Sequence, residues 1–243
     1  MIINLMYHRV TVTNFTHEPE AFEQHLKTLV SRYPIVVPGD YVPKNKAAVC
    51  LTFDDAYYDF YHVVFPLLKK YNVKAVLAIP VKFILDTTSI ASETRLKVPY
   101  NDAMNQYESH ATLCTWQEIQ EMVNTGLVIP ASHSYSHRDL TKSEVDLKQE
   151  VIDSKSLLQE KTQCNITTFV YPYGKMTRAL NRFVKKHYEY AMRIGSALNL
   201  DWQNFHGIHY RVDAEKIWPL GGISENDLFS MGIRFLNNSL RFK

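Results

Sequence analysis

Short apolar runs alternate with longer amphipathic segments along this chain, and that alternation limits its fold more than any other feature. The runs that predict strands are Ile2–Tyr7, Ala47–Phe53, Val73–Ile79, Leu127–Ala131, Thr167–Tyr171, Glu189–Ile194 and Gly207–Val212. Strands that alternate with helices are typical of parallel sheets with right-handed crossovers. Several runs are apolar on both faces, which suits a sheet covered on both sides. About seven such units fit an open or incomplete barrel better than a doubly wound sheet.

Helical spacing recurs between the predicted strands. Apolar residues repeat at that spacing over residues 22–33, and a further helix is expected over Thr177–His187. Thr115 followed by Glu118 predicts a capping box, in a helix that Gly126 ends.

A second capping box is expected at Thr141 and Glu144. The inner face of the helix that it opens should consist of Leu147, Val151, Ser154 and Leu158.

One connection breaks this rhythm. Residues 83–113 are polar, rich in Asn, Ser and Thr, and longer than a strand-to-helix connection needs. The segment is expected to form either part of a substrate rim or a plain surface excursion.

Composition excludes several classes of protein. A chain of 243 residues fits one domain, and its 46% hydrophobic residues suffice for a core. The 27 basic and 25 acidic residues give a net charge of +2 without a basic cluster, so no nucleic-acid partner is predicted. Cys50, Cys114 and Cys164 lack paired spacing and are expected to be reduced thiols, with Cys50 buried.

No targeting or membrane segment is predicted. The opening Met1–His8 lacks the positively charged region of a signal peptide. The longest apolar stretch, Ala75–Leu85, contains Pro80 and Lys82 and is too short to span a bilayer. The chain as written is therefore expected to be soluble and cytoplasmic, with a removed leader as the alternative.

Polar residues follow the predicted strands, at the edge where parallel α/β folds gather their reactive groups. Asp54 and Asp55 follow the second strand. One Asp there is often a helix N-cap, but two adjacent carboxylates repel unless a cation or proton lies between them. His133 and His137 follow the fourth strand. With one carboxylate, these histidines match a two-His, one-carboxylate metal site.

Two weaker signals lie at other strand ends. Pro172 and Gly174 predict a tight turn, whose backbone N–H can face an oxyanion, although an ordinary loop is the alternative. His8 ends the first strand, and by itself it is typical of a structural histidine at the core edge.

Together these motifs resemble the polysaccharide deacetylases, the NodB-homology or carbohydrate esterase family 4 enzymes. The residues that carry the resemblance, in order, are Thr52–Asp55, His133–His137 and Tyr171–Gly174. The opening Leu-Met-Tyr-His-Arg-Val, the segment Pro19–Leu26 and Thr115-Trp116 are similar to the branch of the poly-N-acetylglucosamine deacetylases. The resemblance covers nearly the whole chain and implies one α/β domain over residues 1–243, a distorted (β/α)7 barrel.

The resemblance also implies roles for individual residues. Asp55, His133 and His137 would hold a divalent metal, and Asp54 would be the general base that activates a metal-bound water. That water attacks the amide carbonyl, and the backbone N–H of Tyr173 would hold the oxyanion with the metal. Zinc is the expected cofactor, with Co²⁺, Ni²⁺ or Mn²⁺ as alternatives for this donor set.

The general acid departs from the family pattern. Most members take it from a late Leu-x-His motif, and near the C-terminus His206 and His209 stand in a different context. In the poly-N-acetylglucosamine branch the barrel is circularly permuted, which would bring this motif to the N-terminus. His8 is therefore the expected acid.

Two further positions depart from the pattern. The arginine that orients the catalytic Asp normally stands two residues before the Pro, where this chain has Val170. Arg211, on a late strand, is expected to replace it. Ala56 stands where Gly usually follows the two Asp residues, which we interpret as a minor change.

The implied function is hydrolysis of N-acetyl groups on an acetylated sugar, glycan or glycan precursor. Two alternatives remain open: a deacylase of a small amide or lipid-linked sugar, and a carbohydrate-binding protein that has lost turnover. The sugar, its linkage and the oligomeric state are not predicted.

Overall fold

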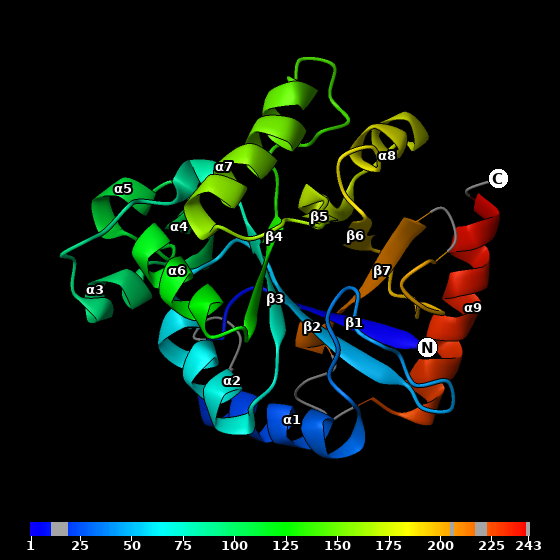
Figure 1. Ribbon diagram of the computed structural model, residues 1–243. Coiled ribbons are helices and arrows are strands. Elements are labelled where there is room, and N and C mark those ends of the chain that lie inside the picture. The colour runs from blue at the N-terminus through cyan, green and yellow to red at the C-terminus, as the bar shows by residue number, and fades with distance from the viewer. Residues whose placement is uncertain (11–18, 205–206, 217–222, 242–243) are drawn as a thin grey trace.

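Seven parallel strands close into one barrel in the order β1 to β7 (Figure 1). The computed structural model describes residues 1–10, 19–204, 207–216 and 223–241. The strands are β1 (Ile2–Tyr7), β2 (Ala48–Phe53), β3 (Ala75–Ile79), β4 (Val128–Ser132), β5 (Thr168–Val170), β6 (Tyr190–Ile194) and β7 (Ile208–Asp213). All seven predicted strands are therefore present. The (β/α)7 barrel that the resemblance implied is confirmed. It is closed and not open or incomplete, because β1 pairs directly with β7, with Asn4 opposite Arg211.

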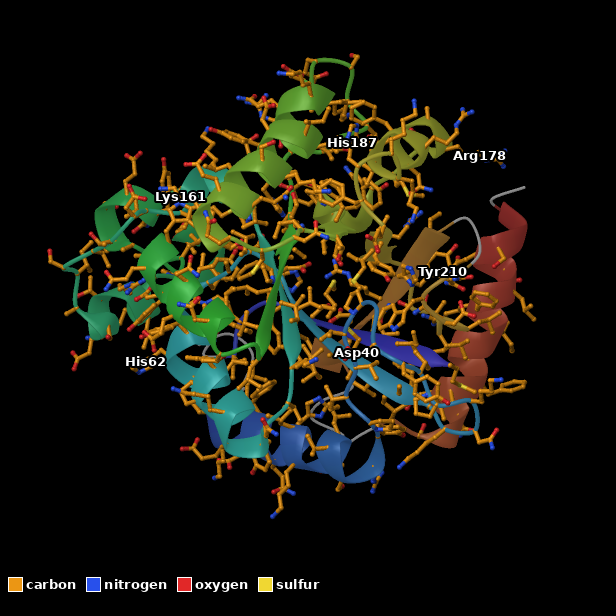
Figure 2. The ribbon with its side chains drawn as sticks, in the orientation of Figure 1. Asp40, His62, Lys161, Arg178, His187 and Tyr210 are labelled. Carbon is orange, nitrogen blue, oxygen red and sulfur yellow. The ribbon has the colours of Figure 1, made fainter. Side chains whose placement is uncertain are left out.

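Helices surround the strands (Figure 1). The longer ones are α1 (Pro19–Arg32), α2 (Phe65–Tyr71), α6 (Trp116–Asn124), α7 (Ser154–Thr162), α8 (Arg178–Val184) and α9 (Glu225–Arg241). Two π-helical turns, η1 (Phe60–Val64) and η3 (Lys148–Asp153), lead into α2 and α7. Tyr210 of β7 packs against Phe235 of α9, and Figure 2 labels this tyrosine between the two elements. No helix in the described ranges is long and apolar enough to cross a membrane.

Strand side chains alternate between the barrel interior and the helix layer. The interior cluster includes Ile2, Ala48, Cys50, Val76, Ala78, Ala131, Val170 and Met192. The intervening residues, such as Ile3 and Val49, pack beneath the helices. His8, Asp54 and His133 continue the inward alternation just past the ends of their strands. Alternation thus directs these three side chains to the C-terminal mouth of the barrel.

The predicted helices agree with the structure in most places. Residues 22–33 fall almost entirely in α1, and Thr177 caps α8 through its side chain. The first capping box is confirmed: the Thr115 side chain accepts from the Glu118 backbone N–H, and the Glu118 carboxylate accepts from the Thr115 N–H.

The second predicted capping box is wrong. Thr141 and Glu144 lie in turns ahead of the helix, because Asp146 stands nearer the first helical turn. Its carboxylate accepts from the backbone N–H of Lys148 at 2.9 Å, which satisfies a donor that the helix leaves unpaired. The predicted inner face is present: Val151, Ser154 and Leu158 are fully buried, and Leu147 is half-buried.

Residues 83–113 fold against the site end of the barrel as three short helices, α3 (Ser92–Lys97), α4 (Tyr100–Ala103) and α5 (Tyr107–His110). Two buried arginines hold the segment through its backbone carbonyls. Arg9 donates to Val98 O at 2.7 Å, and Arg95 donates to Ala111 O at 2.7 Å. Charge-assisted bonds of this kind are stronger than neutral ones. This packing places Tyr100 edge-on against His8, with 5.9 Å between ring centroids. Tyr100 of this segment therefore lies beside the candidate site.

The thiols agree with the prediction. Cys50, Cys114 and Cys164 are free, and the first two are buried.

Candidate metal centre

Three side chains predicted as metal ligands converge at the mouth of the barrel. Asp55 Oδ1 lies 3.3 Å from His137 Nε2 and 3.6 Å from His133 Nε2, and the three ligand atoms lie within 4.8 Å of one another. Asp55 Oδ1 is buried and has no hydrogen-bond partner among the described residues. A buried carboxylate oxygen without a partner is costly. A divalent cation between these atoms would remove that cost, so the donor set fits one.

Hydrogen bonding orients the His133 ring. Its Nδ1 lies 2.8 Å from the Val170 carbonyl oxygen, and because a carbonyl only accepts, Nδ1 carries the proton. Nε2 therefore presents its lone pair to Asp55, which is the tautomer that a metal requires. Burial lowers the pKa of both His133 and His137 to about 4. Both rings are thus neutral at pH 7, as ligand histidines must be.

The loops that carry these residues contain left-handed backbone conformations. Positive φ angles occur at Asp55 (69°), Ala56 (52°), Ser134 (65°), His137 (53°) and Tyr173 (58°). Such angles are unfavourable for residues with a Cβ and cluster at functional sites. At Ala56 the angle gives a reason for the Gly of the resemblance pattern, because Gly adopts it without strain.

Asp54 forms a bidentate pair with Arg211. The two guanidinium nitrogens donate to its two oxygens at 2.6 and 2.9 Å, and both side chains are buried. Burial alone would raise the pKa of Asp54, but the Arg211 charge and hydrogen bonds, helped by His133 and His8, hold it well below its usual range. Asp54 Oδ2 also lies 3.8 Å from His133 Nε2. Asp54 is therefore ionised and borders the three ligands.

His8 approaches the same oxygen of Asp54 as His133 does. Its Nε2 is 3.9 Å from Asp54 Oδ2, and its Nδ1 is 3.2 Å from Glu215 Oε1. Burial lowers the pKa of His8, but the Glu215 hydrogen bond and the charges of Asp54 and Asp55 outweigh it and raise the pKa to about 9. The ring is protonated at pH 7, with one N–H directed at Glu215 and the other toward the site.

Sequence reasoning missed Glu215. It lies just past the end of β7, the position at which parallel strands gather reactive groups, and that position was the signal that could have found it.

Of the remaining candidates, Tyr173 lies at the site and His209 does not. Tyr173 is 57% exposed and packs against His137, with 4.8 Å between ring centroids. His209 is in the barrel interior, packed against Trp202 and Tyr190, one inward position below Arg211 on β7. It does not lie with the site residues. His206 is outside the described residues.

Comparison with known proteins identifies the family. Residues 41–192 match the profile of the family described as "Polysaccharide deacetylase". The chain belongs to this family. The matched segment contains all three candidate ligands and Asp54. It excludes His8 and Arg211, which reach the candidate site through β1 and β7.

Two relatives match this chain over most of its length. It is 29% identical to YxkH of Bacillus subtilis (strain 168) over 182 residues, 70% of this chain and 56% of that protein. It is 27% identical over 185 residues to the poly-beta-1,6-N-acetyl-D-glucosamine N-deacetylase of Escherichia coli (strain K12), 64% of this chain and 26% of that protein. The chain thus spans about half of one relative and a quarter of the other.

Solved structures share its fold. The Streptococcus pyogenes deacetylase PplD, solved in complex with acetate, superposes with a TM-score of 0.69 at 23% identity, covering 95% of this chain and 97% of that one. IcaB from Ammonifex degensii gives 0.67 at 19% identity, with the same coverage of both chains. At these identities the likeness establishes the barrel.

Proposed function

We propose that this protein is a metal-dependent hydrolase that removes N-acetyl groups from an N-acetylated sugar or glycan. Membership of the family and similarity to a poly-N-acetylglucosamine N-deacetylase support the reaction class. The observation that carries the proposal is the unpartnered, buried Asp55 Oδ1, which faces the Nε2 atoms of two neutral histidines. We further propose that residues 1–243 form a single deacetylase domain.

Asp55, His133 and His137 would hold the metal, with Zn²⁺ expected and Co²⁺, Ni²⁺ or Mn²⁺ compatible with the same nitrogen and oxygen donors. When bound, a divalent cation polarises an amide carbonyl and lowers the pKa of water.

Asp54 is the proposed general base. Arg211 occupies both of its oxygens from one side and keeps it ionised, while Oδ2 also faces the ligand side. A carboxylate with a lowered pKa is a weak base for ordinary water. Asp54 can therefore act only on a water whose own pKa is lowered, which couples the base to an occupied metal site.

His8 is the proposed general acid. Glu215 accepts from Nδ1, which fixes the ring so that the Nε2 proton faces the site. From there it can be donated to the amine that leaves the acetyl group. The Tyr173 backbone N–H would contribute to holding the oxyanion, from the turn beside His137.

Exposed aromatic rings suit a carbohydrate substrate. Tyr100 is 38% exposed beside His8, and Tyr173 is 57% exposed beside His137. Each ring offers an apolar face with a polar tip, which matches the mixed surface of a sugar ring.

Acetate release from a panel of N-acetylated saccharides tests the proposal, using Zn²⁺-loaded protein, Asp54→Asn and the exposed control Asp201→Asn. We expect wild type and the control to release acetate. Asp54→Asn should lose activity by about 10²–10⁴-fold while it retains metal. Equal rates for Asp54→Asn and wild type would reject Asp54 as the base. Metal binding without acetate release from any sugar would instead favour a binding protein.

The variant His8→Ala tests the proposed general acid independently of the general base. We expect kcat to fall by about 10²–10⁴-fold with metal content unchanged. Full activity in this variant would remove His8 from the mechanism.

A further inference from the structure

The loop that carries both candidate histidine ligands, Ser132–His137, is held by one buried carboxylate. Glu150 is 2% exposed. Its Oε2 accepts from the backbone N–H of Tyr135 at 3.0 Å and from that of Ser136 at 2.9 Å. Its Oε1 accepts from the Ser136 hydroxyl. Both oxygens of the carboxylate are thus committed to the two residues just before His137.

The helix that carries Glu150 also forms a hydrogen bond with Ser132, the residue before His133. Glu150 lies in the π-helical turn η3, and Ser154 follows one turn later on the same face. The Ser154 hydroxyl donates to the Glu150 carbonyl at 2.7 Å, so its 3.1 Å contact with Ser132 is one in which Ser132 donates. The helix therefore holds the chain immediately before His133 and immediately before His137.

This loop needs external support. Ser134 and His137 adopt positive φ angles of 65° and 53°, and such conformations cost about 1–3 kcal/mol each unless their surroundings enforce them. Within the loop, the His137 N–H donates to the Ser134 hydroxyl at 3.0 Å. The remaining bonds that fix Tyr135 and Ser136 come from Glu150 and from Lys82, whose N–H donates to the Tyr135 carbonyl.

The charge of Glu150 is directed to the loop. Within the described ranges Glu150 forms no ion pair with a Lys or Arg side chain. A buried carboxylate without a cation is stabilised only by strong hydrogen bonds, and those from the Ser136 hydroxyl and the two N–H groups are charge-assisted. Removing the carboxylate would release these donors together.

We propose that Glu150 is a positioning residue: it fixes the loop geometry at which the imidazoles of His133 and His137 meet Asp55, and thereby sets the affinity of the site for a divalent cation. The inference rests on the proposed function for the metal itself. It assigns to Glu150 a role without contact with metal or substrate.

Zn²⁺ affinity measured by chelator competition tests this role in wild type, Glu150→Met and Glu150→Gln. Met keeps the volume and loses the acceptors, and we expect it to weaken Zn²⁺ binding by about tenfold or more. Gln can accept both backbone N–H groups through its oxygen and donate to the Ser136 hydroxyl, so it should bind within about threefold of wild type. Glu144→Met, at an exposed position of the same segment, is the matched control.

The visible absorption of the Co²⁺-loaded proteins gives a second readout, since it reports coordination geometry. We expect the Met spectrum to change and the Gln spectrum to match wild type. Wild-type affinity and spectrum in folded Glu150→Met would overturn the inference while leaving the proposed function intact. Wild type without any metal affinity would overturn both.

Circular dichroism establishes whether Glu150→Met folds. If it does not, Ser136→Ala removes only the hydroxyl donor, and we expect a several-fold loss of Zn²⁺ affinity in this variant. An unchanged affinity in Ser136→Ala would then overturn the inference.

Discussion

The two ends of the barrel interior each contain a fully buried histidine, and the pair differ in their partners. His133 lies at the C-terminal mouth, where Nδ1 donates to a carbonyl and Nε2 faces Asp54 and Asp55. His209 lies deeper, against the rings of Trp202 and Tyr190, where the Trp202 backbone is its polar neighbour. The Trp202 indole beside it donates to the carbonyl of Asp40, which is labelled in Figure 2.

Burial lowers the pKa of both histidines to about 4. A lowered pKa therefore does not separate a candidate ligand from a core residue in this protein. The two histidines differ instead in the groups around their rings. Two carboxylates face Nε2 of His133, whereas aromatic rings pack against His209.

The stability of the C-terminal mouth of the barrel, the polar end, should depend on the buried Asp54–Arg211 ion pair. Arg211→Met leaves Asp54 charged and buried without its bidentate partner, and we expect a loss of about 3–5 kcal/mol in the free energy of unfolding. Urea denaturation measures it. The double variant Arg211→Met/Asp54→Asn should recover most of the loss, and Arg178→Met, at an exposed position labelled in Figure 2, should cost little. A small effect of Arg211→Met would mean that Asp54 finds another partner.

The same pair predicts acid sensitivity. Because the folded-state pKa of Asp54 is lower than its unfolded value near 3.8, its contribution is fully present above about pH 4. That contribution should be lost as the pH falls below this value. Wild type should therefore lose stability more steeply in this range than Asp54→Asn.

His209 should lose its contribution to stability at a higher pH than the Asp54–Arg211 pair does, in the same range as the two buried candidate ligand histidines. Burial lowers the pKa of His209 from its ordinary value of 6.5 to about 4, so its contribution is present above pH 6.5 and is lost as the pH falls toward 4. The total is on the order of 3 kcal/mol. In urea unfolding between pH 7 and 4, His209→Phe should flatten this loss, whereas His62→Phe, at an exposed position, should not. Identical profiles for His209→Phe and wild type would contradict the burial of a neutral ring.

Bound Zn²⁺ should stabilise the protein through the C-terminal mouth of the barrel, where His133 lies, and not through the end that contains His209. With free Zn²⁺ at about 100 times its Kd, binding adds about 2.7 kcal/mol, which an excess of chelator should remove. Thermal unfolding with and without chelator should show this difference in wild type and His209→Phe, and should not show it in His133→Phe. A chelator effect that survives in His133→Phe would place the metal elsewhere.

The smallest expected effect concerns the strained backbone of the polar end. Ala56→Gly relieves a φ of 52° and should raise the free energy of unfolding by up to about 1 kcal/mol, since unfolded-state entropy offsets part of the gain. Ala191→Gly, equally buried but in strand β6, should lower it. If both substitutions destabilised equally, the left-handed conformation would carry no measurable strain.

The strands and several caps could be predicted because their signals are local. Runs such as Ala48–Phe53 are apolar on both faces, and Thr115 with Glu118 needs only neighbours three residues apart. Local signals also mislead. Thr141 and Glu144 fit the same pattern, yet Asp146 caps the helix because it stands closer to the first unpaired N–H groups.

By itself, the sequence determined the seven strand–helix units and the residue types at their ends, including the adjacent carboxylates and the two histidines four positions apart. Both follow from short-range periodicity and from the rule that parallel strands end at one edge.

Only the tertiary structure decided that the barrel closes. Closure pairs Asn4 with Arg211 and so brings Arg211 to Asp54 across 157 residues of chain, and His8 to Glu215 across 207. No local pattern encodes pairing at that separation, because its stability comes from ladder hydrogen bonds and burial that exist only once both strands are in place.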